Sequence, residues 1–329
     1  MNVVRALSNT WDYRFAFPVE RRDDVPAEFR RSYDRLLETC GPPMFGLFSP
    51  AMEDPGFIFS HWLPPNLILV FSESLALLSL ETRSDQVQTF ELSRLDFLGY
   101  SLGEFLLKCW FTLYPGPAAG GGVQIRFPSR ASQQFVELAR ILRNWSDWEG
   151  GTLRNPLQFS RPIPGLPPKF SSFFEGHTEI GPVSEFFFQP ATELRKKREE
   201  TWANVLLLVT RDSIVALTDQ HLRECSQYGI ETTYLPLRCL SSVDWADPHD
   251  GCQSAIRVCL KGAKSELRLS WPVYSGLEPY AIRWVEAVES SVKTSGRESG
   301  HREKLIHQRD QCTTQSTSGA GDHGNSRSD

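Results

Sequence analysis

The sequence lacks any apolar run of the length that a membrane-spanning helix needs. Its longest runs, such as residues 67–71 and 205–209, have about the length of a strand, whereas a bilayer requires about 20 residues. Residues 1–15 also lack the continuous apolar stretch of a secretory signal peptide. The sequence therefore predicts a cytoplasmic protein with no transmembrane segment.

An excess of basic charge is absent as well. The chain of 329 residues has a formal net charge of -5, whereas proteins that grip nucleic acid usually carry a basic field that contacts the phosphates. The seven cysteines form no CxxC pair and their number is odd, which disfavours a disulfide framework and a zinc site. We expect no nucleic-acid partner and no metal.

Recognisable catalytic motifs are missing too. The sequence contains no P-loop, GxGxxG, GxSxG or HExxH pattern, and residues 120–122 are a glycine run between two predicted strands rather than before a helix. The seven histidines are scattered. We expect a non-enzymatic protein without a cofactor, and an active site assembled from scattered residues remains the alternative.

What the sequence does contain is an internal repeat. Gly41-Pro42 recurs as Gly181-Pro182, an offset of 140 (181 − 41). Further matches follow in the same order, with small drifts in offset that indicate loop insertions. They align residues 48–53 with 188–193, 66–70 with 204–208, 90–95 with 235–240, and 123–128 with 267–272, and the lead-in Val25-Pro26 with Phe29 aligns with Leu166-Pro167 and Phe170.

Each copy predicts short strands followed by one helix. In the second copy, strands are expected at 186–189, 205–209, 213–218, 233–237, 242–245, 256–260 and 267–271, because apolar residues there form short runs or alternate with polar ones. After Pro272 the apolar residues fall at helical spacing, and the first copy ends with the same change of period after Pro128.

This order of strands and helix resembles the pleckstrin-homology-like fold, including its bacterial and GRAM-type relatives. The run from Asn204 to Leu217 looks like the central hairpin of that family, and Tyr234-Leu235-Pro236-Leu237 leading to Ser241-Ser242-Val243 looks like the next strand pair. The resemblance implies a mainly β, α+β protein of two bent antiparallel sandwiches, each capped by one helix.

The domain organisation follows from the repeat. We expect an N-terminal lead-in with a short helix at 1–40, a first pleckstrin-homology-like domain at 41–148, and a linker rich in proline and glycine at 149–180. A second domain occupies 181–292. Residues 293–329 are polar and low in apolar content, so they cannot offset the entropy cost of ordering, and we expect a disordered tail.

Two sets of residues are candidates for binding. Apolar residues occupy both faces of the strand predicted at 105–114, so it is expected to be covered on both sides, by the other domain or by a partner. The interface candidates on its second face are Leu106, Trp110 and Tyr114.

The second set is basic. In lipid-binding members of the resembled family, basic residues near the connection of the first two strands hold inositol phosphates. The corresponding residues here are Arg195, Lys196, Lys197 and Arg198, with Arg211, Lys261 and Lys264 at neighbouring ends. Flanking glutamates at i,i+4 spacing favour instead an exposed run of paired charges.

Two functions are weighed on this basis. The leading hypothesis is an interaction or scaffold protein that uses tandem pleckstrin-homology-like domains to bind a protein partner. The alternative is a peripheral protein that binds an anionic, phosphoinositide-like lipid surface through the basic connection of the second domain. Both leave the identity of the partner open.

Overall fold

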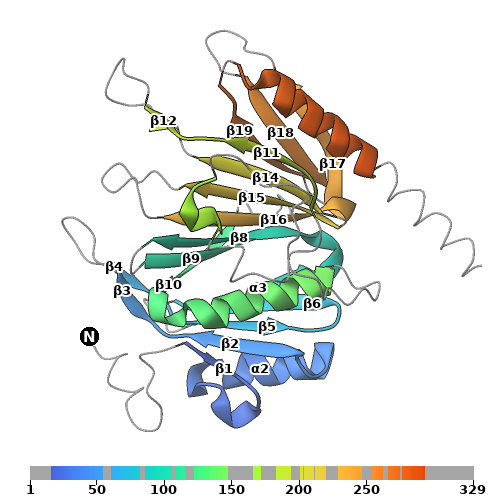
Figure 1. Ribbon diagram of the computed structural model, residues 1–329. Helices are drawn as coiled ribbons and strands as arrows, with labels where there is room; N and C mark the ends of the chain where they lie inside the picture. The colour runs from blue at the N-terminus through green and yellow to red at the C-terminus, as the bar shows by residue number, and fades with distance from the viewer. Residues whose placement is uncertain are drawn as a thin grey trace, which may run out of the picture.

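The computed structural model shows a mainly β, α+β protein, as the sequence predicts (Figure 1). Its strands pair in antiparallel fashion throughout the described regions. The structure describes residues 16–54, 61–81, 86–105, 108–115, 122–146, 166–171, 183–193, 201–202, 204–210, 212–219, 229–246, 254–261, 266–274 and 276–292.

The first repeat runs from β1 and helix α2 to helix α3. Between them the chain forms strands that alternate apolar and polar residues or consist of short apolar runs. In chain order the elements are β1 (Phe17–Pro18), α2 (Ala27–Cys40), β2 (Phe45–Ser49), β3 (Met52–Asp54), β4 (His61–Leu63), β5 (Asn66–Val70), β6 (Ser74–Leu80), β7 (Val87–Ser93), β8 (Phe97–Phe105), β9 (Lys108–Pro115), β10 (Val123–Pro128) and α3 (Ser132–Ser146).

The second repeat has the same order of elements. All seven strands predicted for this copy are present, and its C-terminal helix spans residues 278–292. The strands are β11 (Val183–Gln189), β12 (Thr192–Glu193), β13 (Thr201–Trp202), β14 (Val205–Thr210), β15 (Ser213–Asp219), β16 (Ile230–Pro236), β17 (Leu240–Ala246), β18 (Ala255–Lys261) and β19 (Glu266–Pro272).

The two repeats share one sheet. The order β1-β2-β5-β6-β7 forms a sheet within the first repeat, and β17-β18-β19 forms one within the second. The largest sheet, of order β10-β9-β8-β16-β15-β14-β11, takes three strands from the first repeat and four from the second (Figure 1). The antiparallel β8–β16 pair, which joins the repeats, is called the seam below.

The pairing register shows that the two copies are built alike in detail. The first strand of each three-stranded segment carries an irregularity at the same place, between Phe97 and Gly99 in β8 and between Leu240 and Ser242 in β17. A bulge of this kind bends a strand and increases its twist, so it is a structural feature of the fold and no irregularity of chance. Strand β17 is therefore the counterpart of β8, with an offset of 143 (240 − 97).

The structure corrects two parts of the sequence alignment. Phe48 pairs with Leu67, whereas Phe188 pairs with Leu206, so Leu67 corresponds to Leu206 and not to Val205. A shift of one residue moves every side chain to the other face of a sheet, so the faces decide the alignment. Similarly, Leu92 corresponds to Leu235 rather than Leu237. Leu92 pairs with Leu75 at the start of β6, and Leu235 pairs with Ile214 at the start of β15.

Each repeat also begins with the same turn. The amide of Phe29 donates to the Pro26 carbonyl at 2.9 Å, and the amide of Phe170 donates to the Pro167 carbonyl at 2.9 Å. Both phenylalanine rings are buried. Phe29 belongs to the buried cluster of α2, β5 and β6, and Phe170 belongs to the cluster that includes Leu206. The predicted lead-in match is thus part of each structural repeat.

Three buried clusters hold these layers together. The first lies between α3, the five-stranded sheet and one face of the seven-stranded sheet, and it includes residues of both repeats. The second fills the second repeat beneath the C-terminal helix. The third lies between α2 and the outer face of the five-stranded sheet. Among the described residues, every helix is too short or too polar to cross a membrane.

Candidate interaction surface

The seam brings together strands that lie more than a hundred positions apart in the sequence. Its register pairs Tyr234 with Tyr100, Thr233 with Ser101, Thr232 with Leu102, Glu231 with Gly103 and Ile230 with Glu104. Side chains alternate between the two faces of the sheet. One face of the seam therefore carries the tyrosines, and the other carries Ser101 and Glu231.

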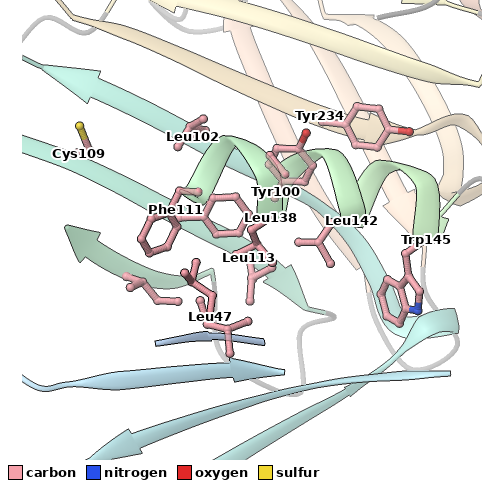
Figure 2. Packing of buried hydrophobic residues seen from close by; sticks show 14 of the residues in the cluster. Leu47, Tyr100, Leu102, Cys109, Phe111, Leu113, Leu138, Leu142, Trp145 and Tyr234 are labelled. Carbon is pink, nitrogen blue, oxygen red and sulfur yellow. The ribbon is translucent and has the colours of Figure 1, made fainter. Parts of the chain in front are cut away.

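On the face toward α3, the seam is aromatic and buried. The rings of Tyr100 and Tyr234 stack with centroids 5.4 Å apart, and Tyr100 stacks on Phe111 at 5.3 Å. Figure 2 shows Tyr234 beside Tyr100, near Leu138 and Leu142 of α3. Stacked aromatic pairs contribute beyond their buried area, so this face fixes the position of the second repeat on the first.

On the opposite face, the seam carries a chain of hydrogen bonds. The Ser101 hydroxyl donates to Glu231 Oε1 at 2.8 Å, and Trp110 Nε1 donates to the same oxygen at 3.4 Å. The Tyr114 hydroxyl donates to Ser101 Oγ at 3.2 Å. Ser101 is fully buried, so its hydroxyl depends on these partners because buried polar groups are costly when unpaired.

Burial also affects the titration of Tyr114. Burial raises the pKa of the Tyr114 hydroxyl, and the negative charge of Glu231 raises it further, although hydrogen bonds with Ser101 and Thr233 act in the opposite direction. A raised pKa keeps the phenol protonated. Tyr114 therefore acts as a hydrogen-bond donor to Ser101.

Two glycines of β8 lie where a Cβ atom would clash with a neighbouring strand or side chain. A Cβ atom at Gly99 would lie 2.3 Å from the Tyr234 carbonyl oxygen, and one at Gly103 would lie 1.9 Å from Trp110 Cε2. Gly99 also has a φ of +137°, a conformation that residues with a Cβ rarely adopt. The indole of Trp110 thus lies directly on the backbone at Gly103.

In the described part of the chain, the counterpart of β8 in the second repeat has a partner strand on one side only. Strand β17 ends the three-stranded sheet, and within the described part of the chain no strand pairs with its outer edge. It contributes Val243 and Trp245 to the core of the second repeat, while Asp244 is exposed. An edge strand presents unpaired N–H and C=O groups to which another strand can add.

Two of the three predicted interface residues lie in the described part of β9, which begins at Lys108 and not at residue 105. Trp110 and Tyr114 lie on the face of β9 opposite the first core, and the second repeat covers them in part through Glu231 and the core beneath its C-terminal helix. Both side chains remain partly exposed. Leu106 lies outside the described residues.

Most of the predicted basic site cannot be placed. Lys261 is exposed at the end of β18, where it pairs across the sheet with Glu266. The other six residues lie outside the part of the chain that the structure describes, namely Arg195, Lys196, Lys197, Arg198, Arg211 and Lys264.

Sequence reasoning missed the residues that form the seam itself. One signal was available, because Gly99 and Gly103 flank Ser101 in what the structure shows to be β8, and glycine in a strand often marks close approach of another backbone. Glu231 has no comparable signal. Its role depends on a partner strand that the sequence does not identify.

The described residues contain no group of three or more His, Cys, Asp or Glu side chains that could hold a metal ion. No protein-family model matches the chain, and no curated protein sequence is significantly similar to it. Support for a function therefore comes from the geometry of the seam and of the edge of β17.

Proposed function

We propose that this chain is a non-enzymatic, cytoplasmic interaction protein built from two pleckstrin-homology-like units, which binds a protein partner by adding a strand of that partner to the outer edge of β17. The order of strands and closing helix in each repeat supports the pleckstrin-homology-like assignment. Such units often act as binding modules, and fold alone does not establish function.

One observation carries the proposal. The edge of β8 accepts β16 as an added strand, and β17 is the counterpart of β8 with the same bulge. Strand addition combines main-chain hydrogen bonds, which supply affinity, with alternate side chains, which supply specificity. The fold thus uses this mode once within the chain, and β17 offers it to another protein.

Site-specific photo-crosslinking in cells tests this proposal. A photoreactive residue at Ser242 on β17 is expected to capture a protein, whereas the same residue at Ser270, an exposed position on β19 of the same sheet, is expected not to. Hydrogen exchange of the β17 amides should slow when the captured protein is added. Equal capture from both positions, or none from Ser242, would contradict the proposal.

Binding to an anionic membrane surface stays a prediction of the sequence. Lys261 is the single member of that basic set within the described residues, and its exposed position is compatible with either function. Vesicle flotation with anionic and neutral liposomes, repeated with Lys196 and Lys197 reversed to glutamate, separates the two functions. Salt-sensitive flotation that the reversal abolishes would favour the lipid surface over the protein partner.

A further inference from the structure

The charge of the two edges differs at one matched position, and this difference indicates what kind of strand β17 accepts. Resting on the proposed function, we propose that the partner strand places a cationic side chain beside Asp244 and an apolar or aromatic side chain opposite Val243. The neighbouring positions of the partner then alternate between these two faces.

The correspondence between the edges follows from the shared bulge. Counting from it, Gly99 of β8 corresponds to Ser242 of β17, Ser101 to Asp244, and Gly103 to Ala246. At the two positions where β8 has glycine, β17 therefore has the small residues Ser242 and Ala246. Small residues leave room for another backbone to approach.

At the position of Ser101 the polarity is reversed. On β8 the Ser101 hydroxyl donates to the Glu231 carboxylate of the added strand at 2.8 Å. Asp244 presents a carboxylate at that position and accepts a hydrogen bond from the Ser242 hydroxyl at 2.9 Å. Across the sheet Asp244 already lies opposite Arg257 of β18. On the side of the incoming strand, a glutamate would add a like charge, whereas arginine or lysine would form a charge-assisted hydrogen bond with the Asp244 carboxylate.

The other face of the added strand needs apolar groups. On β8 this face is lined by Tyr100 and Leu102, and Tyr234 stacks against Tyr100. The corresponding residues of β17 are Val243 and Trp245, which pack with the C-terminal helix. An aromatic or aliphatic side chain opposite Val243 would extend that cluster, as Tyr234 extends the cluster beneath α3.

Strand β7 of a second copy of this chain does not fit the edge. The strand that corresponds to β16 in the first repeat is β7, which ends the five-stranded sheet among the described residues. In the register of the seam, Glu91 of β7 would take the place of Tyr234 and bring its carboxylate to the apolar side, next to Val243. Burying an unpaired carboxylate is strongly unfavourable, so β7 of a second copy is a poor occupant, and the charge at Asp244 favours a cationic strand of a different protein.

A charge-swap experiment with two peptides tests the inference on the full chain. The first probe has the sequence of residues 229–236, and the second has arginine in place of the glutamate at position 231. Fluorescence anisotropy should show at least about tenfold tighter binding of the arginine peptide, since tenfold corresponds to about 1.4 kcal/mol. Asp244→Lys should reverse the preference, and Asp244→Asn should abolish it.

Several outcomes separate this inference from the proposed function. Equal binding of both peptides, with crosslinking from Ser242, would overturn the cationic requirement and leave strand addition intact. If neither peptide binds, the crosslinking experiment is repeated with the photoreactive residue at Ser242 in the Asp244→Lys variant. Loss of the crosslinked protein in that variant supports the inference, and unchanged crosslinking overturns it. No binding and no capture would contradict the proposed function itself.

The remaining alternative is self-association through the same edge. Light scattering of the full chain across a range of concentrations is expected to show the same mass for the native chain and for Asp244→Asn. A dimer that is lost in Asp244→Lys would show that a second copy occupies the edge and would overturn the inference.

Discussion

The backbone of Gly99 lies so close to Tyr234 in the paired strand that a Cβ atom at Gly99 would lie 2.3 Å from the Tyr234 carbonyl oxygen. This relationship joins the two repeats, because it lets β8 and β16 pair where β8 is bent by a bulge. The stability of the seam therefore depends on a position that has no side chain.

Gly99→Ala should destabilise the chain by about 2–5 kcal/mol, because it adds backbone strain and a clash at the seam. Gly41→Ala is the matched control, since Gly41 also has a positive φ, of +77°, but has open space around its Cβ position. Chemical denaturation of both variants separates the two effects. A similar loss in both would show that the clash with Tyr234 is relieved at no cost.

Glu231→Ala should cost about 1–3 kcal/mol, because it leaves the buried Ser101 hydroxyl and the Trp110 indole N–H without their common acceptor. Glu231→Gln keeps an acceptor oxygen and should cost clearly less. The free energy of unfolding in urea measures both changes. An equal loss for alanine and glutamine would mean that the charge, and not the acceptor, stabilises the seam.

Phe170→Ala should cost about 3–5 kcal/mol, as expected for removing a fully buried ring. Phe29→Ala should cost a similar amount, because Phe29 occupies the same turn in the first repeat. Thermal denaturation of each variant tests this equivalence. If Phe170→Ala were nearly neutral, residues 166–171 would not be an integral part of the second repeat.

Asp34 should contribute to stability at neutral pH and lose that contribution in acid. The side-chain hydrogen bonds from Arg22, at 2.7 Å for both atom pairs, lower the pKa of the Asp34 carboxyl. A lowered folded pKa gives stability that is present above the unfolded value, near 3.9, and is lost as the pH falls through the folded value. Unfolding measured between pH 2 and 7 should show this loss, and Asp34→Asn should remove it.

A sequence pattern can predict that a strand is covered without identifying what covers it, as the predictions for Leu106, Trp110 and Tyr114 show. The alternation around them predicts that both faces of β9 are covered, and the partial burial of Trp110 and Tyr114 fits that prediction. The pattern cannot identify the covering element. Glu231, which receives the Trp110 hydrogen bond, lies 121 positions away, and nothing in its local sequence connects it with β9.

The alignment of the repeats shows a second limit. The match of Asn66-Leu67 with Asn204-Val205 is strong in sequence, yet pairing across the sheet relates Leu67 to Leu206. Runs of apolar residues in buried strands look alike in any register. Which face each residue occupies is decided by the layers that pack on it, here α2 in one repeat and residues 166–171 in the other.

The sequence by itself determined the strands, the closing helices, the lead-in turns and the duplication, because periodicity and the bend at each proline are local properties. Only the tertiary structure decided that β16 joins β8, that the repeats share one sheet, and that the edge of β17 has no partner strand within the described residues. The physical reason is that strand pairing uses backbone groups that every residue carries. The selection of one edge over another therefore depends on glycines, buried hydroxyls and charges that meet only after folding.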